Sequence, residues 1–450
     1  MSDILALLQP LAPYVTMTTI RQMSLIISAV ITMTGRVTML GISRWAGKGG
    51  SYRTVQRFFY TVLPWPVLFW LFFRYHAYNP DDVYFLVGDE CVVTKAGKKT
   101  HGLDRFFSGL YGRPVPGLSF LGLSLVSTQQ RRSYPTMVEQ RVRSEAEKAA
   151  AKARAQAKKG KQQSKRGKPG RPKGRKNQDK VQVALTAELQ HVKTMVQKQL
   201  ALINGVLPLT YLVLDGHFGN NNALQMTRQC GLHLISKLRH DAALYFPYSG
   251  PYSGRGPRRK YGDKIDYAHI PAQSLKQVTV EDDVQTCIYQ ATMLHHDFAQ
   301  PLNVVIIVKT NLTTQQRAHV VLFSSDLELA YDPLLDYYSL RFQIEFNFRD
   351  AKQFWGLEDF MNVTETAVTN AANLSLFMVN VAHVLLRDFR HTAPLGGILD
   401  LKALFRGHKY VSETLKLLPQ LPEPVLLARI FDTVPRLGCI HATEPCLNSP

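Results

Sequence analysis

Two short apolar runs, each followed by an aspartate, are the clearest hydrophobic pattern in the chain. Val83–Val87 precedes Asp89, and Leu209–Leu214 precedes Asp215. A continuous apolar run bounded by polar residues predicts a strand that is buried on both faces. An acid at the end of such a strand has to be hydrogen-bonded, ion-paired or metal-bound, because an isolated buried charge is costly. We therefore expect Asp89 and Asp215 each to end a buried strand.

The segments around these strands alternate between strand and helix patterns. Leu118–Thr128 and Leu232–Leu238 are further apolar runs of strand length. Thr186–Asn204 and Asn222–Cys230 carry apolar residues at helical spacing. This order predicts an α/β core in which helices flank a sheet of mixed direction.

Residues 240–335 predict a β-rich insertion. It begins with a basic loop that is rich in Gly and Pro, Phe246–Tyr261. The strand patterns that follow are Gln277–Val280, Thr286–Thr292, Leu302–Val308 and His319–Ser324.

The stretch Tyr338–Lys352 contains neither Pro nor Gly and predicts one helix. At about 100° per residue, four of its polar residues fall within roughly 60° of one another. This stripe consists of Tyr338, Arg341, Glu345 and Lys352. One carboxylate among cations suits a metal ion beside a phosphate chain, while an ordinary salt-bridged helix surface has the same pattern.

Residues 1–78 predict helices throughout, and Thr364–Arg387 predicts a long helix that covers the core. Within the first region, a helix near Ile42–Trp45, a glycine turn and a basic helix capped by Ser51 have the order of a helix-turn-helix DNA reader. A plain helical scaffold has the same order, so both interpretations stay open.

Neither apolar run near the N-terminus predicts a membrane span. Met23–Thr34 and Val62–Phe73 are shorter than the ~20 residues that cross a bilayer. We interpret both as buried helices and expect no membrane partner.

The net charge points to a polyanionic partner. The chain has 450 residues and a formal net charge of +20, and its pI is about 9.7. Such an excess is typical of proteins that bind nucleic acid or an anionic surface. The five cysteines form no C-x2-C pair, which argues against a zinc site or a disulfide framework and favours reduced cytoplasmic thiols.

Much of this charge lies in residues 141–180, where 16 Lys or Arg and 3 Asp or Glu give +13. The segment has almost no large apolar residue and predicts a disordered DNA-binding insert. Its K-P-G-R-P-K-G-R-K run resembles an AT-hook through Arg171, Lys173 and Arg175. Pro169 stands where the usual hook has its first arginine, so nonspecific phosphate attraction is the safer interpretation.

The spacing Tyr338-x2-Arg341-x3-Glu345-x6-Lys352 resembles the Y-R-E-K signature of bacterial DDE transposases of insertion-sequence family four. The resemblance covers roughly residues 80–390. It implies a ribonuclease H-like core with a β-rich insertion before the last catalytic helix and an all-helical N-terminal domain. It also implies that Asp89, Asp215 and Glu345 are catalytic and bind Mg²⁺, for which Mn²⁺ can substitute.

The implied activity is cleavage and strand transfer in cut-and-paste DNA transposition, through a hairpin on the transposon end. The implied partners are terminal inverted repeats, target DNA and a second copy of the chain, at the bacterial nucleoid in the cytoplasm. The expected DNA-contacting residues are Tyr338, Arg341, Lys352, Lys98, Lys99, His101, Arg171, Lys173 and Arg175. A ribonuclease H-like nuclease or resolvase, and a noncatalytic DNA-binding protein derived from a transposase, remain as alternatives.

These expectations divide the chain into seven parts. They are a DNA-end-binding domain (1–78), the first part of the core (79–140), the basic insert (141–180), the second part of the core (181–239), the β-rich insertion (240–335), the catalytic and covering helices (336–390), and a C-terminal helical and coil region (391–450).

Overall fold

The computed structural model describes residues 3–109, 111–149, 153, 179–252, 254 and 256–441. Arg171, Lys173 and Arg175 therefore lie outside the described residues. The helices are α1 (Ile4–Leu8), α2 (Met17–Thr32), α3 (Met39–Ala46), α4 (Tyr52–Tyr60), α5 (Trp65–His76), α7 (Ala187–Ile203), α8 (Asn221–Gln229), α9 (Tyr331–Leu340), α10 (Gln343–Phe354), α11 (Glu365–Arg390), α12 (Ile398–Leu415) and α13 (Pro424–Thr433).

The strands form one sheet. They are β1 (Tyr84–Thr94), β2 (Asp104–Ser108), β3 (Arg113–Ser127), β4 (Arg132–Arg141), β5 (Tyr211–Val213), β6 (His233–Leu238), β7 (Leu244–Pro247), β8 (Tyr261–Lys264), β9 (Leu275–Glu281), β10 (Val284–His295), β11 (Leu302–Asn311) and β12 (Arg317–Ser324).

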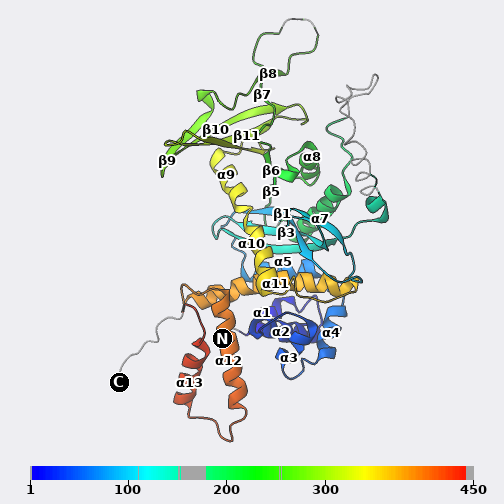
Figure 1. Cartoon of the computed structure of the whole chain (residues 1–450), viewed down its shortest axis with the longest axis vertical. Coiled ribbons are helices and arrows are strands. Elements are labelled where there is room, and N and C mark those ends of the chain that lie inside the picture. The colour runs from blue at the N-terminus through cyan, green and yellow to red at the C-terminus, as the bar shows by residue number, and fades with distance from the viewer. Residues whose placement is uncertain are drawn as a thin grey trace.

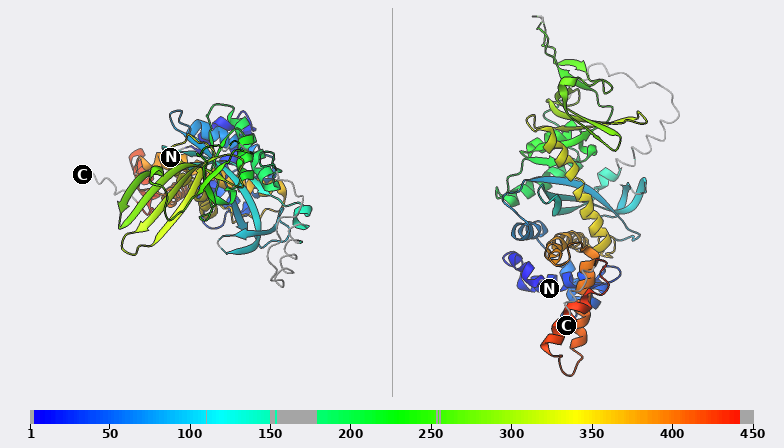
Figure 2. Two further views of the ribbon diagram at one scale, coloured as in Figure 1. Left: turned by 90° about the horizontal axis from the view of Figure 1, so that it is seen from above. Right: turned by 90° about the vertical axis from the view of Figure 1, so that its left-hand side faces the viewer.

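The molecule is elongated, with helices at one end and strands at the other (Figure 1). The N-terminal helices lie beside α12 and α13 at the helical end. The strands β7–β11 lie at the opposite end, and β1 and β3 lie between the two ends. The first and the last helix, α1 and α13, are both at the helical end, as one of two further views also shows (Figure 2).

The sheet mixes parallel and antiparallel pairs, which confirms the expected mixed sheet flanked by helices. Along the main path the order is β2-β3-β1-β5-β6-β12-β11-β10-β7-β8. The pairs β1–β5 and β5–β6 are parallel, whereas β1–β3 and β12–β6 are antiparallel. Since β12 hydrogen-bonds to β6, the strands that follow β6 extend the same sheet instead of forming a separate one.

The strand that carries Asp89 is longer than the sequence predicts. We expected it to end at Asp89, but β1 continues to Thr94. The reason is its partner, because β3 has 15 residues and pairs with β1 from Tyr84 to Thr94. Pairing with β3 thus keeps Glu90–Thr94 in the strand beyond Asp89.

The helix α11 joins the sheet to the N-terminal helices. Its buried Asn380 donates from Nδ2 to the Pro135 carbonyl of β4 at 2.8 Å. Its buried Asn370 accepts a hydrogen bond from Trp65 Nε1 at 2.7 Å. One apolar cluster consequently runs from Ile4 in α1 to Phe405 in α12. This packing positions the sheet edge that carries the acids.

By length and composition, α11 is also apolar enough to cross a membrane. However, 89% of its most apolar window is buried inside the protein. Burial against the sheet and α5 accounts for this apolar character.

Candidate functional site

Two of the predicted acids meet at one edge of the sheet. The strand β1 pairs with β5 only at Leu86 and Val87. Asp89 therefore lies just beyond the end of this pairing. Asp215 follows β5 by two residues. Because β1 and β5 are parallel, their carboxyl ends point in the same direction and bring Asp89 and Asp215 to the same edge.

Backbone contacts fix these two acids. Asp89 Oδ1 accepts from the Glu90 amide at 2.8 Å, and Asp215 Oδ1 accepts from the His217 amide at 3.2 Å. The Asp215 carbonyl accepts from Ser236 Oγ at 2.7 Å. Glu90 itself points to the other face, as strand alternation predicts, where it accepts from Ser119 Oγ.

Glu345 reaches the same edge from the first turn of α10, and Arg341 joins it to Asp89. Arg341 Nη2 lies 3.0 Å from Glu345 Oε1, and Arg341 Nη1 lies 3.4 Å from Asp89 Oδ2. The Arg341 side chain is only 12% exposed. A single, largely buried guanidinium therefore bridges two of the three predicted acids.

The charges of the three acids act on one another. Burial raises the pKa of Asp89 to about 6. The hydrogen bond from the Glu90 amide and the charge of Arg341 oppose this rise. The charges of Asp215 and Glu345 add to it. Burial alone would lower the pKa of Arg341, but Asp89 and Glu345 outweigh it and raise that pKa. Asp89 and Glu345 thus stabilise the charge of Arg341, and the charge of Asp215 acts on Asp89.

The single helix predicted for Tyr338–Lys352 is wrong, because the structure divides it into α9 and α10. At the junction, Phe342 N donates to Ser339 O at 3.2 Å and Glu345 N donates to Phe342 O at 3.0 Å. These i→i−3 bonds tighten the helix into a 3₁₀-type turn with about three residues per turn. Tyr338 and Glu345 consequently lie on different helices, and the stripe is not continuous.

The other predicted DNA-contacting residues have varied surroundings. Lys352 Nζ donates to the Val92 carbonyl at 2.9 Å and pairs with Glu358 at 3.3 Å, so it holds α10 against β1. Lys98 and Lys99 are exposed in the turn between β1 and β2. His101 donates its amide to Val363 at 2.8 Å. Among the described residues, no recorded contact joins these last three to the acids.

The tertiary structure adds basic residues that the sequence analysis missed. A cavity of about 450 Å³ opens beside Asp215 and Arg341. Its further lining residues include Lys237, Arg239, His240, His319 and Tyr338. The run K-L-R-H at residues 237–240 overlaps the end of the predicted strand Leu232–Leu238, and its basic residues were the available signal.

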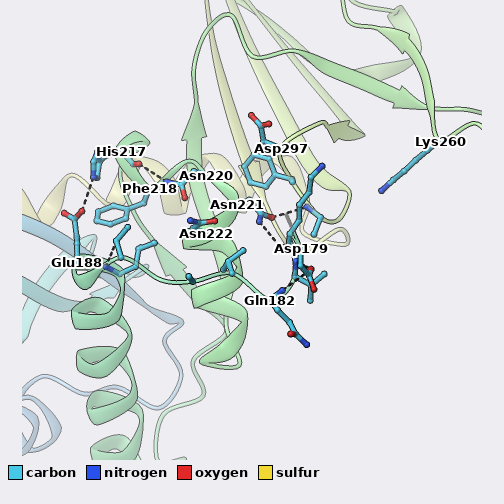
Figure 3. A pocket seen from close by; sticks show the side chains of 18 of the residues that line it. Asp179, Gln182, Glu188, His217, Phe218, Asn220, Asn221, Asn222, Lys260 and Asp297 are labelled. Carbon is cyan, nitrogen blue, oxygen red and sulfur yellow. Dashed lines mark hydrogen bonds and ion pairs between the residues drawn. The ribbon is translucent and has the colours of Figure 1, made fainter. Parts of the chain in front are cut away.

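A larger cavity, of about 1450 Å³, is lined by His217 and Phe218 of the turn after Asp215 (Figure 3). His217 points toward Glu188 at its edge, with 3.5 Å between Nε2 and Oε2. Asn220, Asn221 and Lys260 also line it. Its lining mixes acids, amides and cations and therefore has no strong preference for either charge.

The Asp215 turn requires a glycine at residue 219. Gly219 has a φ of −71°, so space rather than backbone conformation sets this requirement. A Cβ there would lie 2.1 Å from the Lys237 carbonyl oxygen. We expect Gly219→Ala to displace the turn and to lower the free energy of unfolding by about 1–3 kcal/mol.

Chemical denaturation measures this effect, and Gly109→Ala is the matched control. A Cβ at Gly109 meets nothing within 4 Å, so its stability should be that of the wild type. Equal stability of the two variants would show that the turn does not press against β6.

The acids as they stand do not form a metal cage. Within the described ranges, no group of three His, Cys, Asp or Glu side chains is arranged to hold an ion. The chemistry of the donor set nevertheless fits a divalent cation, because carboxylate oxygens are hard ligands and the charges of Asp215 and Glu345 both act on the buried Asp89.

The fold and the acids define an α/β protein with a carboxylate site at the edge of a mixed sheet. A family model described as DDE superfamily endonuclease matches residues 10–295, which is more than half of the chain. The chain therefore belongs to the DDE superfamily of endonucleases. The matched region contains Asp89 and Asp215 and ends before Glu345.

No curated protein matches the chain. Among solved structures, it is similar to a piggyBac transposase in a synaptic complex with hairpin DNA. The identity is 9%, the alignment covers 96% of this chain and 78% of that one, and the TM-score is 0.36.

Proposed function

We propose that the chain is a DDE transposase that cuts transposon-end DNA and joins it to a target. The observation that carries this proposal is that Arg341 bridges Asp89 of β1 and Glu345 of α10, while the charge of Asp215, after β5, acts on Asp89. Membership of the endonuclease superfamily supports it. The sheet order β4-β3-β1-β5-β6 supports a ribonuclease H-like core.

Asp89, Asp215 and Glu345 would hold Mg²⁺, with Mn²⁺ as a substitute. The metal, when bound, supplies Lewis-acid stabilisation of the phosphoryl oxygens and activation of the attacking oxygen. The chain itself positions the reacting strand: α9 and α10 present Tyr338 and Arg341 beside the acids. The Y-R-E-K spacing is the basis for assigning the chain to the bacterial family-four type.

The proposed DNA path includes the N-terminal helices. Ser51 caps α4 by accepting from the Thr54 amide at 3.3 Å, and Arg53 and Arg57 lie on this helix. The α3–glycine–α4 order supports recognition of terminal repeats, and we propose that two copies of the chain hold two ends together. The cytoplasmic nucleoid is the corresponding proposed location.

The test is a cleavage and joining assay on duplexes that carry inverted repeats found beside the coding region. The proposal expects Mg²⁺-dependent nicking at the repeat end and insertion into a target plasmid. Cleavage without joining would favour a nuclease or resolvase, and binding without cleavage would favour a noncatalytic protein.

The basic insert should contribute nonspecific affinity. Residues 150–178 contain 12 Lys or Arg and no acid, so deleting them removes a charge of +12. We expect the deletion to flatten the dependence of DNA binding on log[salt], because fewer counterions are released. A gel-shift titration over several salt concentrations measures the slope. An unchanged slope with lost discrimination between A·T and G·C tracts would instead indicate a minor-groove hook.

A further inference from the structure

Among the described residues, two basic side chains that line the cavity beside Asp215 have donor atoms without an acceptor. Arg341 Nε is buried and has no hydrogen-bond acceptor in the part of the chain that the structure describes. Lys237 lines the same cavity, and its ammonium has no recorded partner among the described residues. A buried N–H without an acceptor is costly, and because Arg341 Nε is enclosed by protein atoms, the side chain has to turn before Nε can reach an acceptor in the cavity.

The surrounding residues fit an anion of phosphate size. Lys237, Arg239 and Arg341 contribute three cations to a lining with one acid, Asp215. Arg239 also pairs with Asp241, at 3.0 Å between Nε and Oδ1, but its side chain is 82% exposed and free to turn. A guanidinium fork binds phosphate oxygens through two parallel N–H donors.

Arg341 is also the counter-ion of two acids that the proposed function assigns to metal. Its two terminal nitrogens face Asp89 and Glu345 while its Nε is unpaired. The same guanidinium cannot keep both contacts and turn fully to an anion in the cavity. Anion binding in the cavity and the ion pairs with the acids therefore compete for Arg341.

We propose that this cavity is a binding site for a phosphodiester phosphate, and that its occupation draws Arg341 from Asp89 and Glu345 and so makes the two carboxylates available to a divalent cation. The inference rests on the proposed metal site. It makes DNA binding and metal binding reciprocal, since each ligand raises the affinity for the other by the same factor.

The test measures Mn²⁺ affinity by the paramagnetic resonance of free Mn²⁺, with and without a saturating short DNA duplex. For the wild type we expect the duplex to tighten Mn²⁺ binding by about tenfold or more. Arg341→Gln should bind Mn²⁺ tightly without DNA, and the duplex should add little. Dimethyl phosphate in place of the duplex tests whether the phosphodiester alone is sufficient.

Two further variants separate the cavity from general charge. Lys237→Gln should keep the wild-type Mn²⁺ affinity without DNA but show weaker tightening by the duplex. Lys198→Gln removes a cation that pairs with Glu139, outside the cavity, and should behave as the wild type. Arg341→Lys keeps the positive charge, so without DNA it should bind Mn²⁺ as weakly as the wild type. It replaces Arg341→Gln if that variant does not fold.

An Arg341→Gln protein with the wild-type Mn²⁺ affinity would overturn the inference, as would full tightening in Lys237→Gln. If the wild type cleaves DNA in Mn²⁺ while Arg341→Gln shows no gain, only this inference fails. If the wild type neither binds Mn²⁺ with the duplex present nor cleaves, the proposed function fails as well.

Discussion

Glu345→Gln is expected to abolish the cleavage of end DNA while leaving its binding intact. The substitution keeps the size and hydrogen bonding of the side chain but removes the charge that a metal needs. We expect cleavage in Mg²⁺ or Mn²⁺ to fall by about a thousandfold or more, as when a group that stabilises transition-state charge is lost. Binding should stay equal or become tighter, because an anion beside the DNA is removed.

Stability should change little in this variant. Glu345 is 40% exposed, so its ion pair with Arg341 contributes at most about 1 kcal/mol. Glu365→Gln is the matched control, because Glu365 occupies the first turn of α11 as Glu345 occupies the first turn of α10. Gel shifts and cleavage assays on the same preparations give both quantities.

Two outcomes would contradict the assignment of Glu345. One is cleavage by Glu345→Gln at the wild-type rate. The other is a loss of DNA binding as large as that of Arg341→Ala. Either would mean that the Arg341–Glu345 pair only stabilises the junction of α9 and α10.

Asn370→Leu is expected to unfold the helical end of the molecule. The Asn370 amide nitrogen donates to Phe59 O at 2.8 Å and to Thr61 O at 2.7 Å, and its oxygen accepts from Trp65 Nε1. The residue is 1% exposed. Leucine would leave buried carbonyls and an indole N–H unpaired, at about 1–3 kcal/mol for each group, so we expect a loss of about 4 kcal/mol in the free energy of unfolding.

Chemical denaturation followed by tryptophan fluorescence measures this loss, since Trp65 reports on the same contacts. Gln353→Leu is the control, because it replaces an exposed amide on α10 by the same side chain. A loss for Asn370→Leu no greater than that of the control would show that α11 and the N-terminal helices are held by apolar contacts alone.

The sequence by itself determined the two strands that lead to Asp89 and Asp215. Their apolar runs are local features of the sequence. The parallel pairing of β1 with β5, which brings the two acids to one edge of the sheet, comes from the fold. The sequence also determined the apolar length of α11 and the concentration of positive charge in residues 141–180. In each case composition or periodicity within one segment was sufficient.

Only the tertiary structure decided what Arg341 and Lys352 contact. The sequence placed both beside Glu345 by helical spacing, yet Arg341 pairs with Asp89, 252 residues away, and Lys352 bonds to the Val92 carbonyl, 260 residues away. The 3₁₀-type turn at Arg341–Phe342 was equally hidden, since it changes hydrogen-bond partners without any Pro or Gly. Periodicity describes neighbours along one element, whereas ion pairs, cavities and the length of β1 depend on residues that only folding brings together.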